Sequence, residues 1–288
     1  MRNDKYALIT GASQGLGKSL ALQCAAKGIN LVLVALPQSG LYELANFIKK
    51  NYTVKVVCIE KDISLEKRCV ELYNEVKAAG IPIYMLINNA GIGGTYFFDE
   101  QETAYYLNLI NVNISAPTVI TRLFISDLEQ HAPSYILNVG SLSGYFSLPM
   151  KQVYAATKSF LFSFTTSLRT ELAHKDIKVS IVCPGGMNTN IHAILNNHSG
   201  SWFSRQSIMN PEDVAAIALE GLLKGKRIII PGKWNRFFLL LDKVLPFFVK
   251  QLIIHTHMQS LRIYHKKSTA LSTTVMHVSK EVSKLVVA

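Results

Sequence analysis

Short apolar segments alternate with longer mixed segments along most of this 288-residue chain. The apolar segments are rich in Val, Ile and Leu and lack a polar alternation, which is typical of strands buried on both faces of a sheet. They predict strands at residues 6–10, 30–36, 53–60, 83–91, 134–141, 178–186 and 227–232. The segments between them predict helices near residues 15–28, 40–50, 65–79, 100–129 and 152–174.

This order of strands and helices predicts an α/β fold, a doubly wound parallel sheet with helices on both faces. Right-handed crossovers then bring the carboxyl ends of the strands to one edge, where ligands bind. No internal repeat or linker divides the apolar pattern. We therefore expect one domain at residues 1–232, followed by an extension at residues 233–288.

Composition narrows the class of protein. Hydrophobic residues make up 49% of the chain and charged residues 17%, which is typical of a globular protein rather than a disordered one. The four cysteines form no C-x-x-C pair and predict free thiols without a metal site. The apolar run at residues 6–9 is short for a signal peptide, and no eighteen-residue stretch lacks both charge and proline. We therefore expect a cytoplasmic protein without a membrane span.

Positive charge is concentrated near the C-terminus. The net charge is +11, and residues 224–288 contain twelve lysines and arginines but two acids. Within this region, residues 234–254 form an amphipathic stretch that Pro246 should interrupt. Asp242 and Lys243 near its middle argue against a bilayer span, so we expect an in-plane anchor on an anionic membrane surface. The alternative is that its apolar face covers the substrate pocket or a partner subunit. Because no nucleic-acid-binding module is recognisable, we expect no nucleic-acid partner.

A glycine-rich turn, TGASQGLG at residues 10–17, directly follows the first predicted strand and opens a helix. Gly11 permits a tight turn, Gly15 lets the backbone approach a diphosphate, and Gly17 lets the helix pack close to the strand. The helix N-terminus supplies free N–H groups and the positive end of a dipole. The turn therefore predicts a site for a phosphate-bearing ligand.

Tyr154 and Lys158 lie four residues apart in a predicted helix, so they share one face. Reduction of a carbonyl by hydride leaves an alkoxide that needs a proton, and a free tyrosine with a pKa of about 10 donates weakly at neutral pH. A nearby ammonium favours phenolate and should lower the pKa of Tyr154 toward the working range. The pair therefore suits proton transfer, although it occurs by chance in many proteins.

The glycine spacing and the Tyr-x-x-x-Lys pair together resemble the short-chain dehydrogenase/reductase family. More of the family's motifs follow in order on the expected elements, between residue 5 and about residue 232: DIS (62–64), NNAG (88–91), NVN (111–113), GSLSG (140–144) and PGGMNT (184–189). Each motif alone is weak, but together they are specific. The resemblance implies an NAD(P)-dependent oxidoreductase that acts on CH–OH and C=O groups.

The resemblance also implies roles for individual residues. Ser141 lies thirteen residues before Tyr154, and Asn113 lies twenty-eight before Ser141, as in the family's catalytic tetrad. In that tetrad Ser141 would polarise the carbonyl, Lys158 would also grip the nicotinamide ribose, and Asn113 would hold a relay water. The implied cofactor contacts are Gly11, Ser13, Gln14, Gly15, Leu16, Gly17, Asp62, Ile63, Asn89, Ala90, Gly91, Tyr154, Lys158, Pro184, Gly185 and Thr189. Asn88 is expected to be structural.

The end of the second strand selects the cofactor in this family. Ala35 and Leu36 stand there, and neither is an acid or an arginine. Because no acid would repel a phosphate, we expect NADP(H) to be favoured, with NAD(H) as the alternative. Lys18, Gln38 and Ser39 are further candidate contacts.

Substrate choice is expected to come from the loop at residues 187–207. This loop carries Ile191, Ile194, Leu195, Trp202 and Phe203, which predict an apolar, lipid-like or steroid-like substrate. The phenylalanine-rich stretch at residues 160–164 predicts core packing or the interface of a homodimer or homotetramer. The alternative function is a catalytically weak NAD(P)-binding protein with a regulatory or membrane role. A relative of epimerases and dehydratases is disfavoured because few residues follow Pro184.

Overall fold

A computed structural model of the chain describes residues 4–188, 206–246, 248–250, 252 and 255–256. The chain divides into two compact units, residues 1–239 and 240–288. The first unit contains the sheet and the helices that cover it. The prediction of a domain boundary after residue 232 stays a prediction, although residues 233–239 belong to the first unit.

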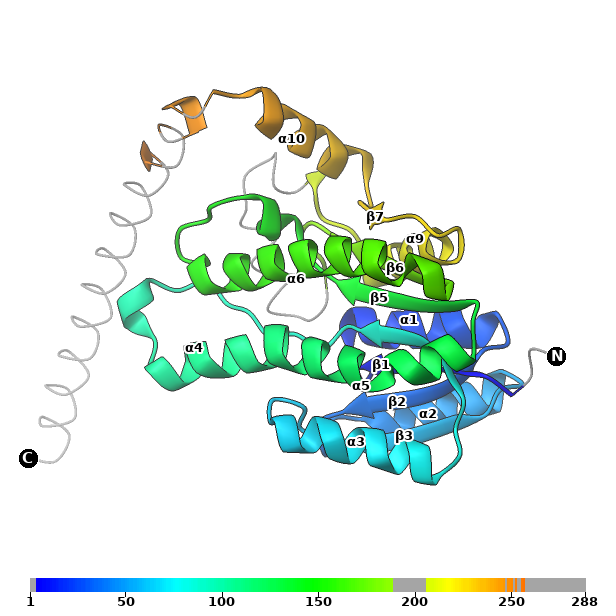
Figure 1. The fold of residues 1–288 in the computed structure, drawn as a ribbon. Coiled ribbons are helices and arrows are strands. Elements are labelled where there is room, and N and C mark those ends of the chain that lie inside the picture. The colour runs from blue at the N-terminus through cyan, green and yellow to red at the C-terminus, as the bar shows by residue number, and fades with distance from the viewer. Residues whose placement is uncertain (1–3, 189–205, 247, 251, 253–254, 257–288) are drawn as a thin grey trace, which may run out of the picture. The chain divides into compact units, whose positions relative to one another are not determined.

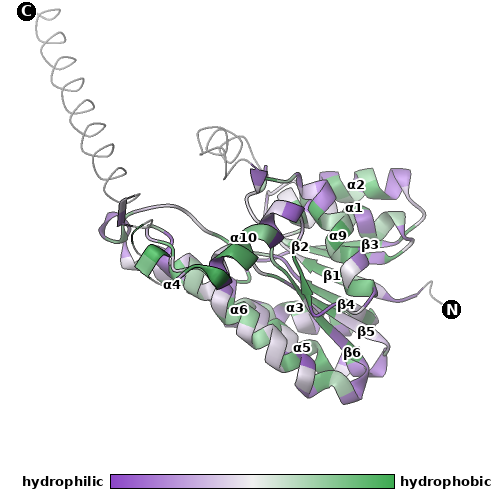
Figure 2. Ribbon diagram, turned by 90° about the horizontal axis from the view of Figure 1, so that it is seen from above, coloured by the Kyte–Doolittle hydropathy of each residue, from purple (hydrophilic) through white to green (hydrophobic). Residues whose placement is uncertain are grey.

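Within the described residues, seven parallel strands form one sheet in the order β3-β2-β1-β4-β5-β6-β7 (Figure 1). The strands are β1 (Tyr6–Thr10), β2 (Asn30–Ala35), β3 (Val56–Glu60), β4 (Ile83–Asn88), β5 (Ser134–Val139), β6 (Ile177–Val182) and β7 (Ile228–Ile229). All seven predicted strands are present, and the last contains only two residues. Figure 2 shows the sheet in the green of hydrophobic residues, as expected for strands buried on both faces.

Helices cover both faces of this sheet, so the predicted doubly wound fold is confirmed. One apolar core packs beneath α1 (Gly15–Ala26), α2 (Leu41–Asn51) and α9 (Pro211–Leu223). The other packs beneath α3 (Glu66–Ala78), α5 (Ala116–Gln130) and α6 (Gln152–Glu171), with Phe124 fully buried at its centre. The strand order reverses between β1 and β4, and such a reversal opens the crevice in which ligands bind.

Helix α9 was not predicted, although its start carries clear signals. Asn210 precedes the helix with an extended backbone, Pro211 occupies the first turn, and Glu212 and Asp213 follow it. Proline at the first position and acids in the first turn both favour a helix start. At the C-terminal side, α10 (Lys233–Val244) ends two residues before Pro246, which confirms the predicted interruption there.

The long helix between β4 and β5 contains a local irregularity. It begins as α4 (Thr103–Ile110), continues through a π-helical turn at Asn111–Ser115, and ends as α5. Thr103–Gln130 is also the one described helix that is long and apolar enough to cross a membrane, by length and composition alone. Its buried Asp127 pairs with Lys77 of α3 at 2.5 Å, and Phe124 lies in the core. These contacts are those of a helix that covers a sheet.

Candidate active site

The turn between β1 and α1 requires its glycines. Gly11 and Gly15 have φ angles of +64° and +53°, in the left-handed region that favours glycine. At Gly17, an added Cβ atom would lie 2.1 Å from the carbonyl oxygen of Gly11. The backbone therefore passes closely over the N-terminus of α1, where the free N–H groups suit a diphosphate. Among the neighbouring predicted contacts, Gln14 is exposed, whereas Leu16 is buried and points its side chain toward the core.

Asn89 braces this turn from the neighbouring strand end. Its Nδ2 donates hydrogen bonds to the carbonyl oxygens of Thr10 (2.9 Å) and Gly11 (3.0 Å). The backbone N–H groups of Asn89 and Ala90 both donate to the Thr10 hydroxyl at 3.1 Å. Both amide donors of Asn89 thus bind the turn itself, and its contact with the cofactor stays a prediction. Ala90 and Gly91 follow it directly on the same loop.

Asn88 has the structural role predicted for it. Its Nδ2 donates to the Thr121 hydroxyl (2.9 Å) and to Oδ1 of Asn138 (2.8 Å), and it is 4% exposed. These bonds link β4, α5 and β5 in the interior of the domain.

The π-helical turn at residues 111–115 aims Asn113 into the site. Asn113 is fully buried, and its Oδ1 accepts a hydrogen bond from the backbone N–H of Ile92 at 2.9 Å. Its Nδ2 donates to the Ile92 carbonyl oxygen (2.9 Å) and to the Thr157 hydroxyl (3.1 Å). Asn113 therefore joins the loop after β4 to the helix that carries Tyr154 and Lys158. The motif order indicated this residue, but the π turn that orients it was not predicted, and π turns recur at functional sites.

Ser141, Tyr154 and Lys158 converge at the carboxyl end of β5. The Lys158 Nζ lies 5.7 Å from the centroid of the Tyr154 ring and donates to the Val139 carbonyl oxygen at 2.9 Å. Ser141 follows β5, and its hydroxyl accepts the backbone N–H of Ser143 at 3.1 Å and lies close enough to the Tyr154 phenol to lower its pKa. A Cβ atom at Gly91 would lie 3.4 Å from Lys158 Nζ and 3.3 Å from Asn113 Oδ1, so the loop after β4 closes over both.

Burial reverses the direction predicted for the tyrosine. The pKa of Tyr154 is raised because burial penalises the phenolate, and the hydrogen bond from Ser141 opposes this rise. Burial likewise lowers the pKa of Lys158 to about 8. The Lys158 ammonium lies over the Tyr154 ring and does not offset the water that burial removes from the phenol. The pKa of Tyr154 is therefore not lowered as predicted.

An acid, Glu60, lies beside the end of β2, where the sequence predicted none. In the parallel register Ala35 of β2 pairs with Glu60 of β3, and the backbone N–H of Gln38 donates to Glu60 Oε1 at 3.0 Å. Glu60 therefore lies beside the end of β2, which selects the cofactor in this family. It could have been found from the sequence, because Glu60 is the last residue of the strand expected to neighbour β2.

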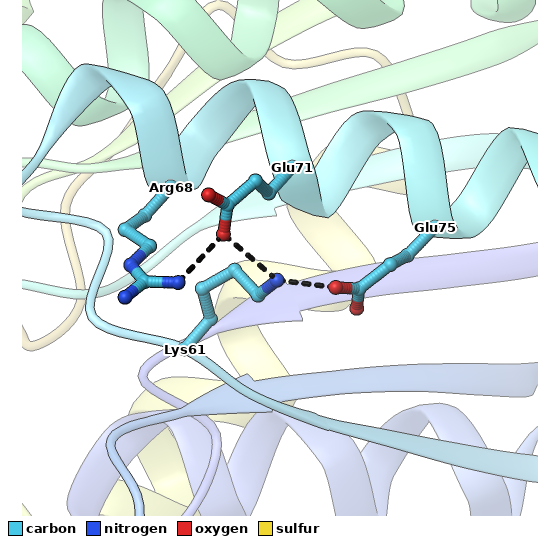
Figure 3. Close-up of polar contacts among 4 residues, drawn as sticks. All are labelled: Lys61, Arg68, Glu71 and Glu75. Atoms are coloured by element: carbon cyan, nitrogen blue, oxygen red, sulfur yellow. Dashed lines mark hydrogen bonds and ion pairs between the residues drawn. The ribbon is translucent and has the colours of Figure 1, made fainter.

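The next residue, Lys61, is held by helix α3. Its Nζ contacts Glu71 at 3.5 Å and also binds Glu75, while Arg68 binds Glu71 at 2.8 Å (Figure 3). The Lys61 side chain is 8% exposed. Its charge is therefore neutralised within the β3–α3 connection rather than free for a phosphate.

The connection from β3 to α3 also carries the predicted adenine contacts. Asp62 is exposed, and its Oδ1 accepts the backbone N–H of Ser64 at 3.0 Å. Ile63 is buried, and the Cys69 thiol donates to its carbonyl oxygen at 3.3 Å. The turn is thus rigid, and the Asp62 carboxylate is accessible at the edge where ligands bind.

The segment after β6 meets a residue that sequence reasoning missed. Asn235 of α10 is 1% exposed, and its Nδ2 donates to the carbonyl oxygens of Pro231 (2.8 Å) and Ser207 (3.2 Å). A Cβ atom at Gly185 would lie 2.6 Å from Asn235 Oδ1. Asn235 therefore packs directly on the Pro184–Gly185 turn that the family resemblance assigns to the cofactor. Thr189 and most of the predicted substrate loop, residues 189–205, lie outside the described residues.

A small cavity opens beside Tyr154. It is lined by Gly94, Tyr96, Tyr105, Leu109, Met150 and Lys151, and none of these was predicted as a site residue. Tyr96 and Tyr105 meet edge to face with ring centroids 5.8 Å apart. The wall next to the predicted proton donor is therefore largely aromatic and apolar.

Metal chemistry finds no support among the described residues, where no group of three or more His, Cys, Asp or Glu side chains could hold a metal ion. The four cysteines are free thiols, and burial raises the pKa of Cys24 to about 12. The glycine turn, by contrast, fits a dinucleotide, because its glycines allow the tight bend that opens α1 and leave the free N–H groups of that helix start for a diphosphate.

Comparison with known proteins agrees with this geometry. A sequence model of the family described as short chain dehydrogenase matches residues 5–200. The chain is 30% identical to the 11-beta-hydroxysteroid dehydrogenase-like 4A of Arabidopsis thaliana over 246 residues, covering 85% of this chain and 82% of the relative. It is 33% identical to the very-long-chain 3-oxoacyl-CoA reductase-A of Danio rerio over 186 residues, covering 62% of this chain and 57% of that protein.

Solved structures show the same fold. A short-chain dehydrogenase from Sphingobium yanoikuyae in complex with NADPH superimposes with a TM-score of 0.72 at 25% identity. The match covers 90% of this chain and 94% of that structure.

Proposed function

Because this chain belongs to the short-chain dehydrogenase/reductase family, we propose that it transfers a hydride between NADP(H) and the carbonyl or hydroxyl group of an apolar, lipid-like or steroid-like substrate. Family membership makes it an NAD(P)-dependent oxidoreductase of CH–OH and C=O groups. The proposal adds the preferred cofactor, the substrate class and the residues that carry the reaction. The observation that carries it is the convergence of Ser141, Tyr154 and Lys158 at one strand end.

Each of these residues has a role that its position supports. When bound, the nicotinamide would supply or accept the hydride. Tyr154 donates the proton that the reduced carbonyl oxygen needs, and Ser141 hydrogen-bonds the same oxygen as negative charge develops on it. Lys158 keeps its ammonium beside the ring through its bond to Val139, and holds the ribose of the cofactor. Asn113, which bonds to Ile92 and Thr157, fixes the loop after β4 and holds a relay water.

The cofactor preference rests on the end of β2. Ala35 and Leu36 offer no carboxylate of their own to a ribose 2′-hydroxyl, and a similar solved structure holds NADPH. Glu60 acts against a 2′-phosphate at the same place, because like charges repel. We therefore infer a modest preference for NADP(H), with NAD(H) also accepted.

The substrate class is supported by the apolar wall beside Tyr154 and by the names of the relatives. Tyr96, Leu109 and Met150 offer an apolar surface next to the proton donor. Curated relatives are named as a reductase of very-long-chain 3-oxoacyl-CoA and as hydroxysteroid dehydrogenase-like proteins. Both descriptions concern large apolar molecules with an oxygen function.

The C-terminal extension supports a peripheral membrane role. In the second unit, Val244 and Phe248 are 74% and 72% exposed, and Asp242 pairs with Lys250 at 2.9 Å. Exposed apolar residues flanked by lysines and arginines are typical of an in-plane anchor on anionic lipid. We therefore infer a cytoplasmic enzyme that associates with the inner face of a membrane. Exposed Leu107 and Phe160 on α4 and α6 also favour a homodimer or homotetramer.

The test is oxidation of NADPH in the presence of a panel of medium- and long-chain ketones and ketosteroids. Tyr154→Phe should lower the rate by about a hundredfold or more, because a general acid contributes about 10² to 10⁴. Cofactor binding, followed by NADPH fluorescence, should change little in that variant. Binding of NADPH without turnover of any ketone would instead support the alternative, a catalytically weak NAD(P)-binding protein.

A further inference from the structure

Lys151 is a second lysine beside Tyr154, three residues before it in the chain. It immediately precedes α6, lines the small cavity, and places its Nζ 6.0 Å from the centroid of the Tyr154 ring. The cavity is narrow, with about 10 Å³ of space that water can enter. The Tyr154 ring is thus approached by two ammonium groups, Lys151 from the cavity and Lys158 from the helix.

In the part of the chain that the structure describes, no carboxylate balances the charge of Lys151. Among the described residues, its ammonium makes no ion pair and no hydrogen bond, although its side chain is partly buried. The predicted substrate loop cannot supply a partner either, because residues 189–205 contain no Asp or Glu. The charge of Lys151 therefore faces the cavity without a counter-ion from these segments.

The position of Lys151 at the start of α6 also disfavours its positive charge. It precedes the N-terminus of α6, where the helix dipole favours negative rather than positive charge. Burial also lowers the pKa of Lys151, because it removes water from the charged form. A bound anion would stabilise the ammonium against both the helix dipole and burial. A lysine kept only for packing would be replaced at lower cost by an apolar residue.

The cavity offers a further donor with no assigned partner. The Tyr105 hydroxyl is buried and has no hydrogen-bond partner among the described residues. Tyr96, Leu109 and Met150 supply apolar contacts around it. The cavity therefore combines apolar walls with two polar groups that suit an oxygen-rich group on a ligand.

We propose that Lys151 binds an anionic oxygen group of the substrate, a carboxylate or a phosphate, that lies a few bonds from the carbonyl reduced at Tyr154. The short separation between the two groups follows from the geometry. The carbonyl must reach the Tyr154 hydroxyl, and the anion must reach the Lys151 ammonium, which lies 6.0 Å from the centroid of the same ring. The substrate is then amphipathic, such as an oxo acid with an apolar chain. This inference rests on the proposed function and narrows its substrate class.

The test compares an oxo acid with its neutral ester. Steady-state NADPH oxidation is measured for 4-oxodecanoate and methyl 4-oxodecanoate with the full chain and with Lys151→Gln, Lys151→Arg and Lys50→Gln. The full chain should prefer the acid in kcat/KM, and Lys151→Gln should reduce the acid-to-ester ratio by about tenfold, the usual worth of a charge-assisted contact. Lys151→Arg should keep the ratio because it keeps the charge. Lys50, an exposed lysine of α2, is the matched control.

A binding measurement separates this inference from the proposed function. Decanoate should raise the thermal unfolding temperature of the full chain more than methyl decanoate does, and Lys151→Gln should remove the difference. If the ester is reduced as well as the acid by every variant, the role of Lys151 is wrong while the proposed function stands. If neither ketone is reduced, the proposed function fails for this class. The decanoate measurement then decides whether Lys151 binds an anion.

Discussion

Lys158 lies beside Tyr154 with its Nζ 5.7 Å from the ring centroid, yet its hydrogen bond goes to the carbonyl oxygen of Val139 rather than to the phenol. The lysine is 4% exposed, and burial lowers its pKa to about 8. An ammonium held in the interior by a single strand carbonyl is costly to the folded state. This cost is consistent with a residue kept for function.

The buried ammonium predicts a pH-dependent stability difference between the wild type and Lys158→Met. Between about pH 8 and pH 10.5 the lysine is neutral in the folded protein but still protonated in the unfolded chain. The free energy of unfolding therefore rises with pH across this range. The gain reaches about 3 kcal/mol at its upper limit. Urea unfolding of both proteins across this range measures it.

The difference between the two proteins is the informative quantity. Burial raises the pKa of Cys24 and Cys183 to about 12. These thiols ionise at lower pH in the unfolded chain, so they lower the free energy of unfolding as the pH rises and oppose the effect of the lysine. Cys24 does not interact with Lys158, so its effect cancels between the two proteins, whereas the charge of Lys158 lowers the pKa of Cys183 and its removal adds to the difference. Parallel pH profiles of the wild type and Lys158→Met would contradict a lowered pKa at Lys158.

Glu60→Gln should shift the cofactor preference further toward NADPH. The carboxylate beside Gln38 lies where a 2′-phosphate would approach, and its removal ends a repulsion. The ratio of kcat/KM for NADPH over NADH should rise by about fivefold, equal to about 1 kcal/mol for a solvated charge pair. Glu171→Gln, an exposed acid at the end of α6, is the control and should leave the ratio unchanged. An unchanged ratio in Glu60→Gln would place the discrimination elsewhere.

Asn235→Ala should destabilise the first unit. The substitution removes the amide that donates to the carbonyl oxygens of Pro231 and Ser207, which costs about 1–3 kcal/mol of unfolding free energy. Chemical denaturation measures this loss, and Asn46→Ala on the exposed face of α2 is the control.

The contact between Asn235 and Gly185 can be tested by a double-mutant cycle. Gly185→Ala places a Cβ atom 2.6 Å from Asn235 Oδ1 and should be strongly destabilising in the wild type. It should cost less in the Asn235→Ala background, because part of the clash is gone. Additive effects would show that Asn235 does not pack on the turn in solution.

Charges placed on the exposed apolar residues of the extension should weaken membrane binding. Val244→Glu and Phe248→Glu should each reduce co-sedimentation of the full chain with vesicles of anionic lipid, since each removes apolar burial and adds repulsion. Phe47→Glu, a 53% exposed phenylalanine on α2, is the matched control. If the wild type stays in the supernatant at low salt, the segment is assigned to packing or to a partner subunit instead.

Local sequence pattern was sufficient for the sheet, the glycine turn and the Tyr154–Lys158 pair. Buried parallel strands must be apolar on both faces, a tight phosphate-binding turn must contain glycine, and an i, i+4 spacing alone puts two side chains on one helix face. These requirements act within a few residues, so they can be seen in the sequence. The family assignment followed from the order of such local motifs, and it is confirmed.

The rest of the site depends on contacts between residues far apart in the chain. Glu60 lies beside the end of β2 only because β2 and β3 pair in parallel register, and Asn235 reaches Gly185 across fifty residues of sequence. The pKa of Tyr154 was predicted to fall and is instead raised, because burial of the phenol outweighs the hydrogen bond from Ser141. Burial and strand register are properties of the packed chain. Only the tertiary structure could therefore decide the electrostatics of this site and the residues that line it.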